Sequence, residues 1–142
     1  MNVDKWMKRE LLTVGPQDNL MRTWLLMVSH RIRHLPVVHA NGTLVGILSD
    51  RDIKNHAVSI DSAEPALAQQ GHLEAISVAK AMIREVITIE PEAAMSEAAL
   101  LMKEHRIDCL PVVRKGRVIG IVTSTDILDY FIHIQAYVRA AV

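Results

Sequence analysis

Short apolar runs and a helical pattern of apolar residues open the chain. The β-rich run at residues 11–14 is ended by Gly15 and Pro16, which break regular structure, and it predicts a short strand. Residues 20–28 carry apolar side chains at the three- and four-residue spacing of one helix face, so they predict a helix. The first elements are therefore a strand followed by a helix.

A β-hairpin and a second helix are predicted next. Residues 35–38 and 44–48 are short apolar runs, and the Ala-Asn-Gly sequence at 40–42 between them is a favourable turn. Ser49 is a preferred N-cap residue, and the acidic residues that follow it suit the positive end of a helix dipole. The predicted unit is β-α-β-β-α.

The same pattern occurs twice. An offset of 75 residues aligns residues 3–53 with 78–127 through a gap of one residue. Shared segments are His-Arg-Ile at 30–32 and 105–107, Leu-Pro-Val-Val at 35–38 and 110–113, and Gly-Ile at 46–47 and 120–121. The second copy repeats the predicted elements at 86–89, 95–104, 110–113, 118–122 and from 124 towards 131. The chain therefore holds two copies of one supersecondary unit.

Each copy is too small to cover both faces of its own sheet, so the copies are expected to pack on each other. We predict an α+β fold of tandem β-α-β-β-α repeats related by a pseudo-twofold axis, with two related clefts between them. The expected domains are a first repeat at 1–58, a connector with partial helix at 59–76, a second repeat at 77–133 and a C-terminal tail at 134–142.

The composition excludes several classes of protein. Half of the 142 residues are hydrophobic and 23% are charged, which favours a folded chain. The 16 basic residues equal the 16 acidic ones, so the basic excess of a nucleic-acid-binding protein is missing. No apolar run reaches the roughly 18 residues that cross a membrane, and the N-terminus has no apolar signal core. We expect a cytoplasmic protein that binds neither nucleic acid nor membrane.

A Ser/Thr-x-x-Asp sequence begins the last helix of each copy. The hydroxyl of Ser49 or Thr123, with the free amides of the first helical turn, can bind phosphate oxygens. One turn later, the carboxylate of Asp52 or Asp126 can accept hydrogen bonds from both hydroxyls of a ribose. The spacing also fits a capping box that only stabilises the helix. Both interpretations remain open at this stage.

Each copy has a Leu-Pro-Val-Val strand followed by a second conspicuous segment, Gly46 to Ile53 in the first and Gly120 to Ile127 in the second. This repeated pattern resembles a cystathionine β-synthase (CBS) domain pair, or Bateman module. The first copy is particularly similar to the CBS portion of acetoin-utilisation regulatory proteins, because 31–34 reads Arg-Ile-Arg-His and 49–52 reads Ser-Asp-Arg-Asp. The resemblance implies a regulatory module that is not an enzyme and is usually a homodimer. Such a module binds AMP, ADP, ATP or S-adenosylmethionine between its repeats, needs no obligatory cofactor, and signals to a regulated protein by conformational change.

The resemblance also implies where a purine would lie. Its walls would be Ile32 and His34 or Ile107 and Cys109, with Ile47 or Ile121 beneath. In the family each cleft takes its strand residues from one copy and its aspartate from the other. Arg33, His34 and Arg51 can neutralise phosphate in the first copy. In the second copy the strand positions that match Arg33 and His34 hold Asp108 and Cys109. We therefore expect unequal affinities. The expected ligand-binding residues are Ile32, Arg33, His34, Ile47, Ser49, Arg51, Asp52, Ile107, Asp108, Cys109, Ile121, Thr123 and Asp126.

Simpler interpretations accompany these assignments. The arginines can be solvated surface residues, and the single cysteine can be a small core residue or a regulatory thiol. The seven histidines lack a recurrent ligand spacing, so no metal site is expected. No Gly-rich phosphate loop with lysine and no nucleophile–base pattern suggests catalysis. The alternative function is a ligand-free dimerisation scaffold.

Surplus apolar surface suggests a homodimer. Apolar residues crowd the first helix of each copy and the end of the chain, and burial against a second chain or between the copies would cover them. The residues are Trp24, Leu25, Leu26, Met27, Leu100, Leu101, Met102, Tyr130, Phe131, Ile132, Ile134, Tyr137 and Val138.

Overall fold

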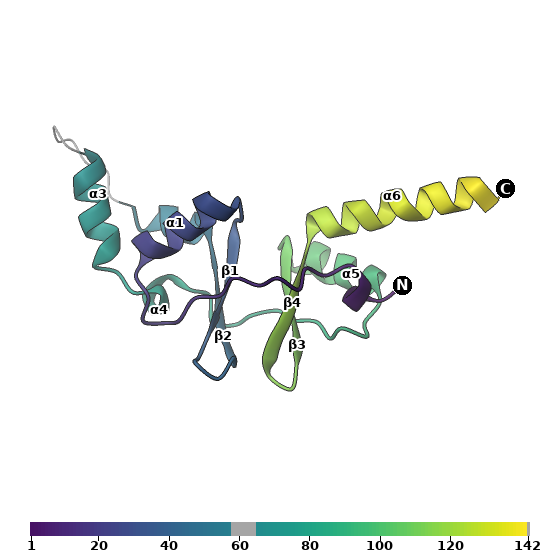
Figure 1. Cartoon of the computed structure of the whole chain (residues 1–142), viewed down its shortest axis with the longest axis horizontal. Helices are drawn as coiled ribbons and strands as arrows, with labels where there is room; N and C mark the ends of the chain where they lie inside the picture. The colour runs from purple at the N-terminus through teal and green to yellow at the C-terminus, as the bar shows by residue number, and fades with distance from the viewer. Residues whose placement is uncertain (58–64, 142) are drawn as a thin grey trace. The chain divides into compact units, whose positions relative to one another are not determined.

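The computed structural model describes residues 1–57 and 65–141, which form two compact units. The first unit consists of residues 12–86 and the second of residues 1–11 together with 87–142. Each unit contains one antiparallel β-hairpin and the helices that pack on it (Figure 1). The predicted α+β fold class is confirmed.

After the first predicted strand, the first unit has the predicted helix, hairpin and second helix in order, followed in the described residues by two more helices. These elements are α1 (Leu20–His30), β1 (His34–Val38), β2 (Leu44–Ser49), α2 (Asp50–Asn55), α3 (Pro65–Glu74) and α4 (Val78–Ala81). Those of the second unit are a 3-10 helix, η1 (Val3–Lys5), then α5 (Met95–His105), β3 (Cys109–Arg114), β4 (Arg117–Thr123) and α6 (Ser124–Ala141). The helix α3 lies in the predicted connector, of which residues 59–64 fall outside the described residues.

The first predicted strand of each copy is reduced to a single parallel bridge. Val14 pairs with Val37, and its N–H donates to Pro36 O at 3.1 Å. A longer ladder would need the N–H of Pro36 as the next donor, which proline lacks. The second unit repeats this arrangement, since Ile89 bridges Val112 beside Pro111. The predicted strands at 11–14 and 86–89 are therefore wrong in length, and each sheet has two strands.

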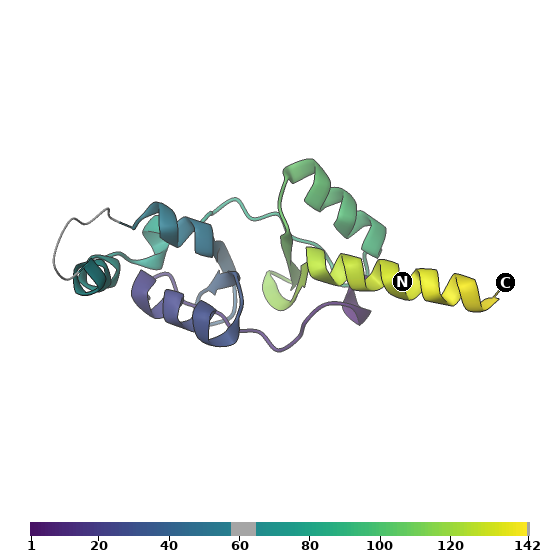
Figure 2. The same cartoon turned by 90° about the horizontal axis from the view of Figure 1, so that it is seen from above.

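Capping residues and helix-breaking residues explain where the helices begin and end. Asn19 caps α1 by accepting from Arg22 N at 2.9 Å, and the helix ends at Arg31 in the left-handed region (φ 54°). The last helix, α6, does not stop near Phe131 as predicted but continues to Ala141 (Figure 2). The sequence after Gly120 contains neither glycine nor proline, so no helix-breaking residue ends the helix in the expected tail.

The opening segment of each sequence repeat pairs with the hairpin of the other repeat. Lys8, from the start of the first repeat, bridges Ile121 of β4 with N···O distances of 2.8 and 3.0 Å. Ile83, from the start of the second repeat, bridges Ile47 of β2 with two distances of 2.9 Å. The structural units therefore cut across the repeats at 1–58 and 77–133.

Each unit has a core of its own. The fully buried side chains of the first include Leu20, Leu35, Leu48, Ile53 and Val78, and those of the second include Val3, Met95, Leu110, Val112 and Val122. These residues come from helices and from both hairpin strands of each unit, so each core holds the strands that lead into the predicted site.

Part of the predicted apolar surplus is buried inside the units. Met27 and Met102 are buried, and Leu26 and Leu101 pack on the core of their own unit. Trp24 joins the first core, and Tyr130 packs edge-on against Trp6 with ring centroids 5.5 Å apart. The large apolar side chains that stay exposed on these helices include Leu25, Val28, Leu100, Leu128, Phe131, Ile132, Tyr137 and Val138.

Candidate functional site

The hairpin of the first unit brings the start of β1 beside the end of β2. His34 and Ser49 are direct partners across the antiparallel ladder. Asp50 N then donates to Arg33 O at 2.9 Å, which fixes the first residue of α2 against the residue before β1. Residues that lie 15 or more positions apart in the sequence therefore meet at one junction within the first unit.

Ser49 and Asp52 form a capping box at this junction. Ser49 N donates to Asp52 Oδ2 at 2.8 Å, and Asp52 N donates to Ser49 Oγ at 3.1 Å. The stabilising role of this pair is thus present in the structure. Asp52 Oδ1 accepts no hydrogen bond from another described residue, and the side chain is only half-buried. One carboxylate oxygen is left to accept hydrogen bonds from elsewhere.

The second unit has the same junction. Cys109 and Thr123 are ladder partners, and Ser124 N donates to Asp108 O at 2.9 Å. Thr123 N donates to Asp126 Oδ2 at 2.8 Å, and the Thr123 hydroxyl donates to the same oxygen at 3.3 Å. The carboxylate again folds back towards the end of its strand, but here it takes two donors from one threonine.

Lys8 distinguishes the second junction from the first. Its Nζ lies 3.0 Å from Asp126 Oδ1, and Asp126 is 5% exposed. The offset that aligns the repeats places Lys8 opposite Ile83, so the first unit has an isoleucine where the second has this lysine. Sequence reasoning missed Lys8 because 118 positions separate it from Asp126. Its difference from Ile83 within the aligned repeats was the available signal.

The predicted wall residues lie near each junction. Ile32 is half-buried and packs on the first core, and Ile107 does the same in the second. Ile47 and Ile121 are half-buried in the middle of β2 and β4. The sharing of each cleft between the two repeats stays a prediction.

The predicted phosphate-binding arginines are exposed. Neither the Arg33 nor the Arg51 side chain makes a hydrogen bond or ion pair with another described residue. Both flank the Ser49 junction in sequence, while exposed Asp108 occupies the matching place beside Thr123. The charge difference between the two junctions is therefore present at their surface.

Cys109 is a buried thiol with little nucleophilic character. Burial, with smaller contributions from the charges of Asp108 and Asp126, raises its pKa from 9.0 to about 12. The side chain therefore stays protonated at neutral pH, where only the thiolate would react. This favours the interpretation of Cys109 as a small core residue over that of a regulatory thiol.

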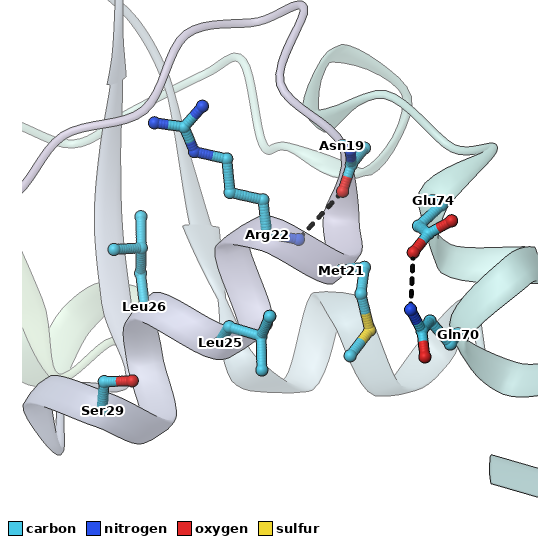
Figure 3. Close-up of a pocket in the computed structure, with 8 residues that line it drawn as sticks. All are labelled: Asn19, Met21, Arg22, Leu25, Leu26, Ser29, Gln70 and Glu74. Atoms are coloured by element: carbon cyan, nitrogen blue, oxygen red, sulfur yellow. Dashed lines mark hydrogen bonds between the residues drawn. The ribbon is translucent and has the colours of Figure 1, made fainter. Parts of the chain in front are cut away.

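A separate hollow of about 580 Å³ lies between α1 and α3 (Figure 3). Its lining consists of Asn19, Met21, Arg22, Leu25, Leu26, Ser29, Gln70 and Glu74. None of the predicted site residues contributes to it, and its polar groups are partly used locally, as in the Gln70–Glu74 hydrogen bond of 2.9 Å. Within the described ranges, no group of three His, Cys, Asp or Glu side chains is placed to hold a metal ion. No described helix is long and apolar enough to span a membrane.

Comparison with known proteins gives consistent matches across the chain. The family model for the CBS domain matches residues 3–59 and 77–133. A CBS domain-containing protein of Dictyostelium discoideum is 33% identical over 136 residues, which cover 93% of this chain and 92% of that protein. A crystal structure of a Vibrio cholerae protein described as an acetoin utilization protein has a TM-score of 0.79 and 30% identity, covering 99% of this chain and 96% of the other.

Another solved relative contains ligands. The CBS domain pair of protein MJ0100, in complex with 5′-methylthioadenosine and S-adenosyl-L-methionine, has a TM-score of 0.76 and 31% identity, with 92% of this chain and 99% of that chain covered. Enzymes also match, but only in part. The chain spans about a quarter of the length of the homoserine O-acetyltransferases that it resembles, 24% for that of Methanococcus vannielii.

Proposed function

Because the chain belongs to the family of proteins built from CBS domains, we propose that it is a regulatory module that binds an adenosine-containing ligand at one or both of the junctions marked by Asp52 and Asp126. Binding would change the conformation of the module and so regulate a partner protein. A ligand shifts such an equilibrium only through unequal affinity for the two arrangements, so the bound form must present contacts that the free form lacks.

The observation that carries the proposal is the open oxygen of Asp52. The capping box uses Oδ2 alone, and Oδ1 has no partner among the described residues. A carboxylate can accept several hydrogen bonds at its two oxygens, so Asp52 can cap α2 and bind the neighbouring hydroxyls of a ribose at the same time. The stabilising and ligand-binding roles of the motif are therefore compatible.

Family relationships support the choice of an adenosine ligand. The MJ0100 domain pair, 31% identical to this chain, is solved with two molecules that each carry an adenosine group. Beside Asp52, exposed Arg33 and Arg51 add positive charge suited to a phosphate, which favours AMP, ADP or ATP. We therefore include both the nucleotides and the sulfur-containing adenosine compounds among the candidate ligands.

A ligand-free dimerisation scaffold is the second candidate function. It is favoured by the completed capping box at Ser49, which accounts for the motif without a ligand. It is also favoured by the exposed face of α6, where Leu128, Phe131, Ile132 and Val138 lie on one side of the helix at offsets of three, four and ten residues. We propose that this face binds a second copy of the chain in either case.

Substitution of Asp52 by asparagine tests the site itself. The amide oxygen of Asp52→Asn can still accept from Ser49 N, whereas the amide NH₂ cannot accept from a ribose hydroxyl. Equilibrium dialysis should show ligand binding weakened by at least about tenfold, the cost of losing a hydrogen bond to a charged group. The matched control is Asp50→Asn, which removes the same charge from the same helix and should bind normally. Equal binding by both variants would assign the motif to capping alone.

A further inference from the structure

We propose that Lys8 closes Asp126 to the ribose of an adenosine ligand, so that each chain binds one such ligand, at Asp52. This inference rests on the proposed function and specifies which of its two sites is used. The two junctions share their backbone pairing, and among the differences between their described side chains only Lys8 contacts the aspartate carboxylate from another segment of the chain.

Both carboxylate oxygens of Asp126 already have donors. Thr123 N and the Thr123 hydroxyl hold Oδ2, and the Lys8 ammonium holds Oδ1. With 5% of its surface exposed, Asp126 has little room for two further donors. At the first junction the corresponding oxygen, Asp52 Oδ1, has no such donor among the described residues, and Asp52 is less buried.

A ribose hydroxyl competes poorly with this lysine. An ammonium–carboxylate hydrogen bond joins two ions and is roughly twice as strong as one between neutral groups, and it brings the compensating charge that a buried carboxylate needs. A ligand that displaced Lys8 would offer neutral hydroxyls in its place and leave the negative charge unbalanced. The diol is therefore expected to bind Asp52 in preference to Asp126.

The backbone keeps the lysine in place. Lys8 N donates to Ile121 O at 2.8 Å, and Ile121 N donates to Lys8 O at 3.0 Å. Gly120 allows this close approach, because a Cβ there would lie 3.1 Å from Lys8 O. Only the side chain, 58% exposed, is free to leave Asp126.

The first junction has an isoleucine where the second has the lysine. Ile83 bridges Ile47 as Lys8 bridges Ile121, and Gly46 stands in the place of Gly120. Ile83 is 50% exposed and carries no charge to offer Asp52. The natural sequence thus supplies both substitutions needed for a test, an isoleucine in place of Lys8 and a lysine in place of Ile83.

Isothermal titration with 5′-methylthioadenosine, a neutral probe with an intact ribose diol, distinguishes the sites. Wild-type chain should bind one molecule. Lys8→Ile should bind two, and Lys8→Arg, which keeps the cation, should bind one. Ile83→Lys should weaken binding at Asp52 by at least about tenfold, since the new ammonium competes for Asp52 Oδ1. If Lys8→Ile does not fold, as judged by circular dichroism, Lys8→Met removes the charge while keeping an unbranched chain.

Different results overturn the two proposals. Two equal sites in the wild type, one site in a folded Lys8→Ile or Lys8→Met chain, or unchanged affinity in Ile83→Lys would contradict the role of Lys8 and leave ligand binding intact. Failure of every chain to bind this probe or any other adenosine ligand would instead remove the proposed function.

Discussion

The backbone of Ile83 exchanges two hydrogen bonds of 2.9 Å with the backbone of Ile47, although the two residues belong to different sequence repeats. Lys8 and Ile121 form the reciprocal pair. Each hairpin therefore carries, along its second strand, the opening segment of the other repeat. This exchange places Lys8 beside Asp126 and makes the two junctions chemically unequal.

Gly46 is required for the Ile83 segment to approach β2. A Cβ at this position would lie 2.6 Å from Met82 Sδ and 3.0 Å from Ile83 O. The methionine can move, but the backbone oxygen is fixed by the bridge. We expect Gly46→Ala to lower the free energy of unfolding by about 1–3 kcal/mol, as overpacking in cores does, measured by urea denaturation.

Gly71 provides the control for this substitution. It lies in α3, and a Cβ there would have nothing within 4 Å. Gly71→Ala should leave stability unchanged or raise it by up to about 1 kcal/mol, because alanine favours helix. If Gly46→Ala were equally harmless, the close approach of Ile83 to β2 would not be a constraint on the fold.

The cap at Ser49 contributes to stability apart from any ligand. Ser49 Oγ accepts from Asp52 N, which otherwise has no partner in the six-residue helix α2. Ser49→Ala should lower the free energy of unfolding by about 1 kcal/mol, measured without ligand by thermal or urea denaturation. The exposed Ser29 near the end of α1 is the control, and its replacement by alanine should have little effect. A Ser49→Ala chain as stable as the wild type would show that the capping box is dispensable.

Much of this arrangement is readable from the sequence. The repeat, the two hairpins and the helix that begins after Ser49 follow from apolar periodicity and turn residues, which are local signals. The first strands were overestimated because Pro36 and Pro111 withhold a donor from a neighbouring chain segment that periodicity does not identify. The length of α6 was underestimated because its apolar residues fit a tail as well as a helix.

Long-range pairing was beyond those signals. Nothing local to Lys8 says that it meets Asp126, since the contact depends on which hairpin receives the opening segment. The aligned repeats place Lys8 opposite Ile83. Only the pairing of each opening segment with the other repeat's hairpin shows that this difference puts an ammonium group beside Asp126. The sequence predicted two unequal junctions from Arg33, Arg51 and Asp108, and the structure adds the contact of Lys8 with Asp126 to that difference.

The raised pKa of Cys109 predicts a thiol that resists alkylation. With a pKa of about 12 in the folded chain, almost no thiolate exists at pH 8, so iodoacetamide should modify Cys109 only after unfolding. Mass spectrometry of native and urea-treated protein measures this difference. Rapid modification of the native protein would show that the thiol is accessible and ionised.

The same pKa shift predicts a pH dependence of stability. Folding favours the protonated thiol, so its contribution is complete below the unfolded value of 9.0 and is lost as the pH rises towards 12. Cys109→Ala should reduce the decline in unfolding free energy across this alkaline range. An identical decline in the variant would assign it to other groups.

The apolar face of α6 predicts a homodimer that depends on Phe131. This side chain is 59% exposed on the described helix and lies among other exposed apolar residues. Phe131→Ala should shift the mass measured by sedimentation velocity from dimer towards monomer, while Asp129→Ala, nearly opposite on the helix, should not. A wild-type chain that sediments as a monomer at all concentrations would contradict this use of the face.

The most direct test of the proposed function is a titration of the wild-type chain, by isothermal calorimetry, with 5′-methylthioadenosine, S-adenosylmethionine, AMP, ADP and ATP. Our account predicts saturable binding of at least one of these compounds with a dissociation constant below about 1 mM, about −4 kcal/mol, and binding at least about tenfold weaker in Asp52→Asn. Absence of binding by all five in a folded chain would contradict it and favour the scaffold.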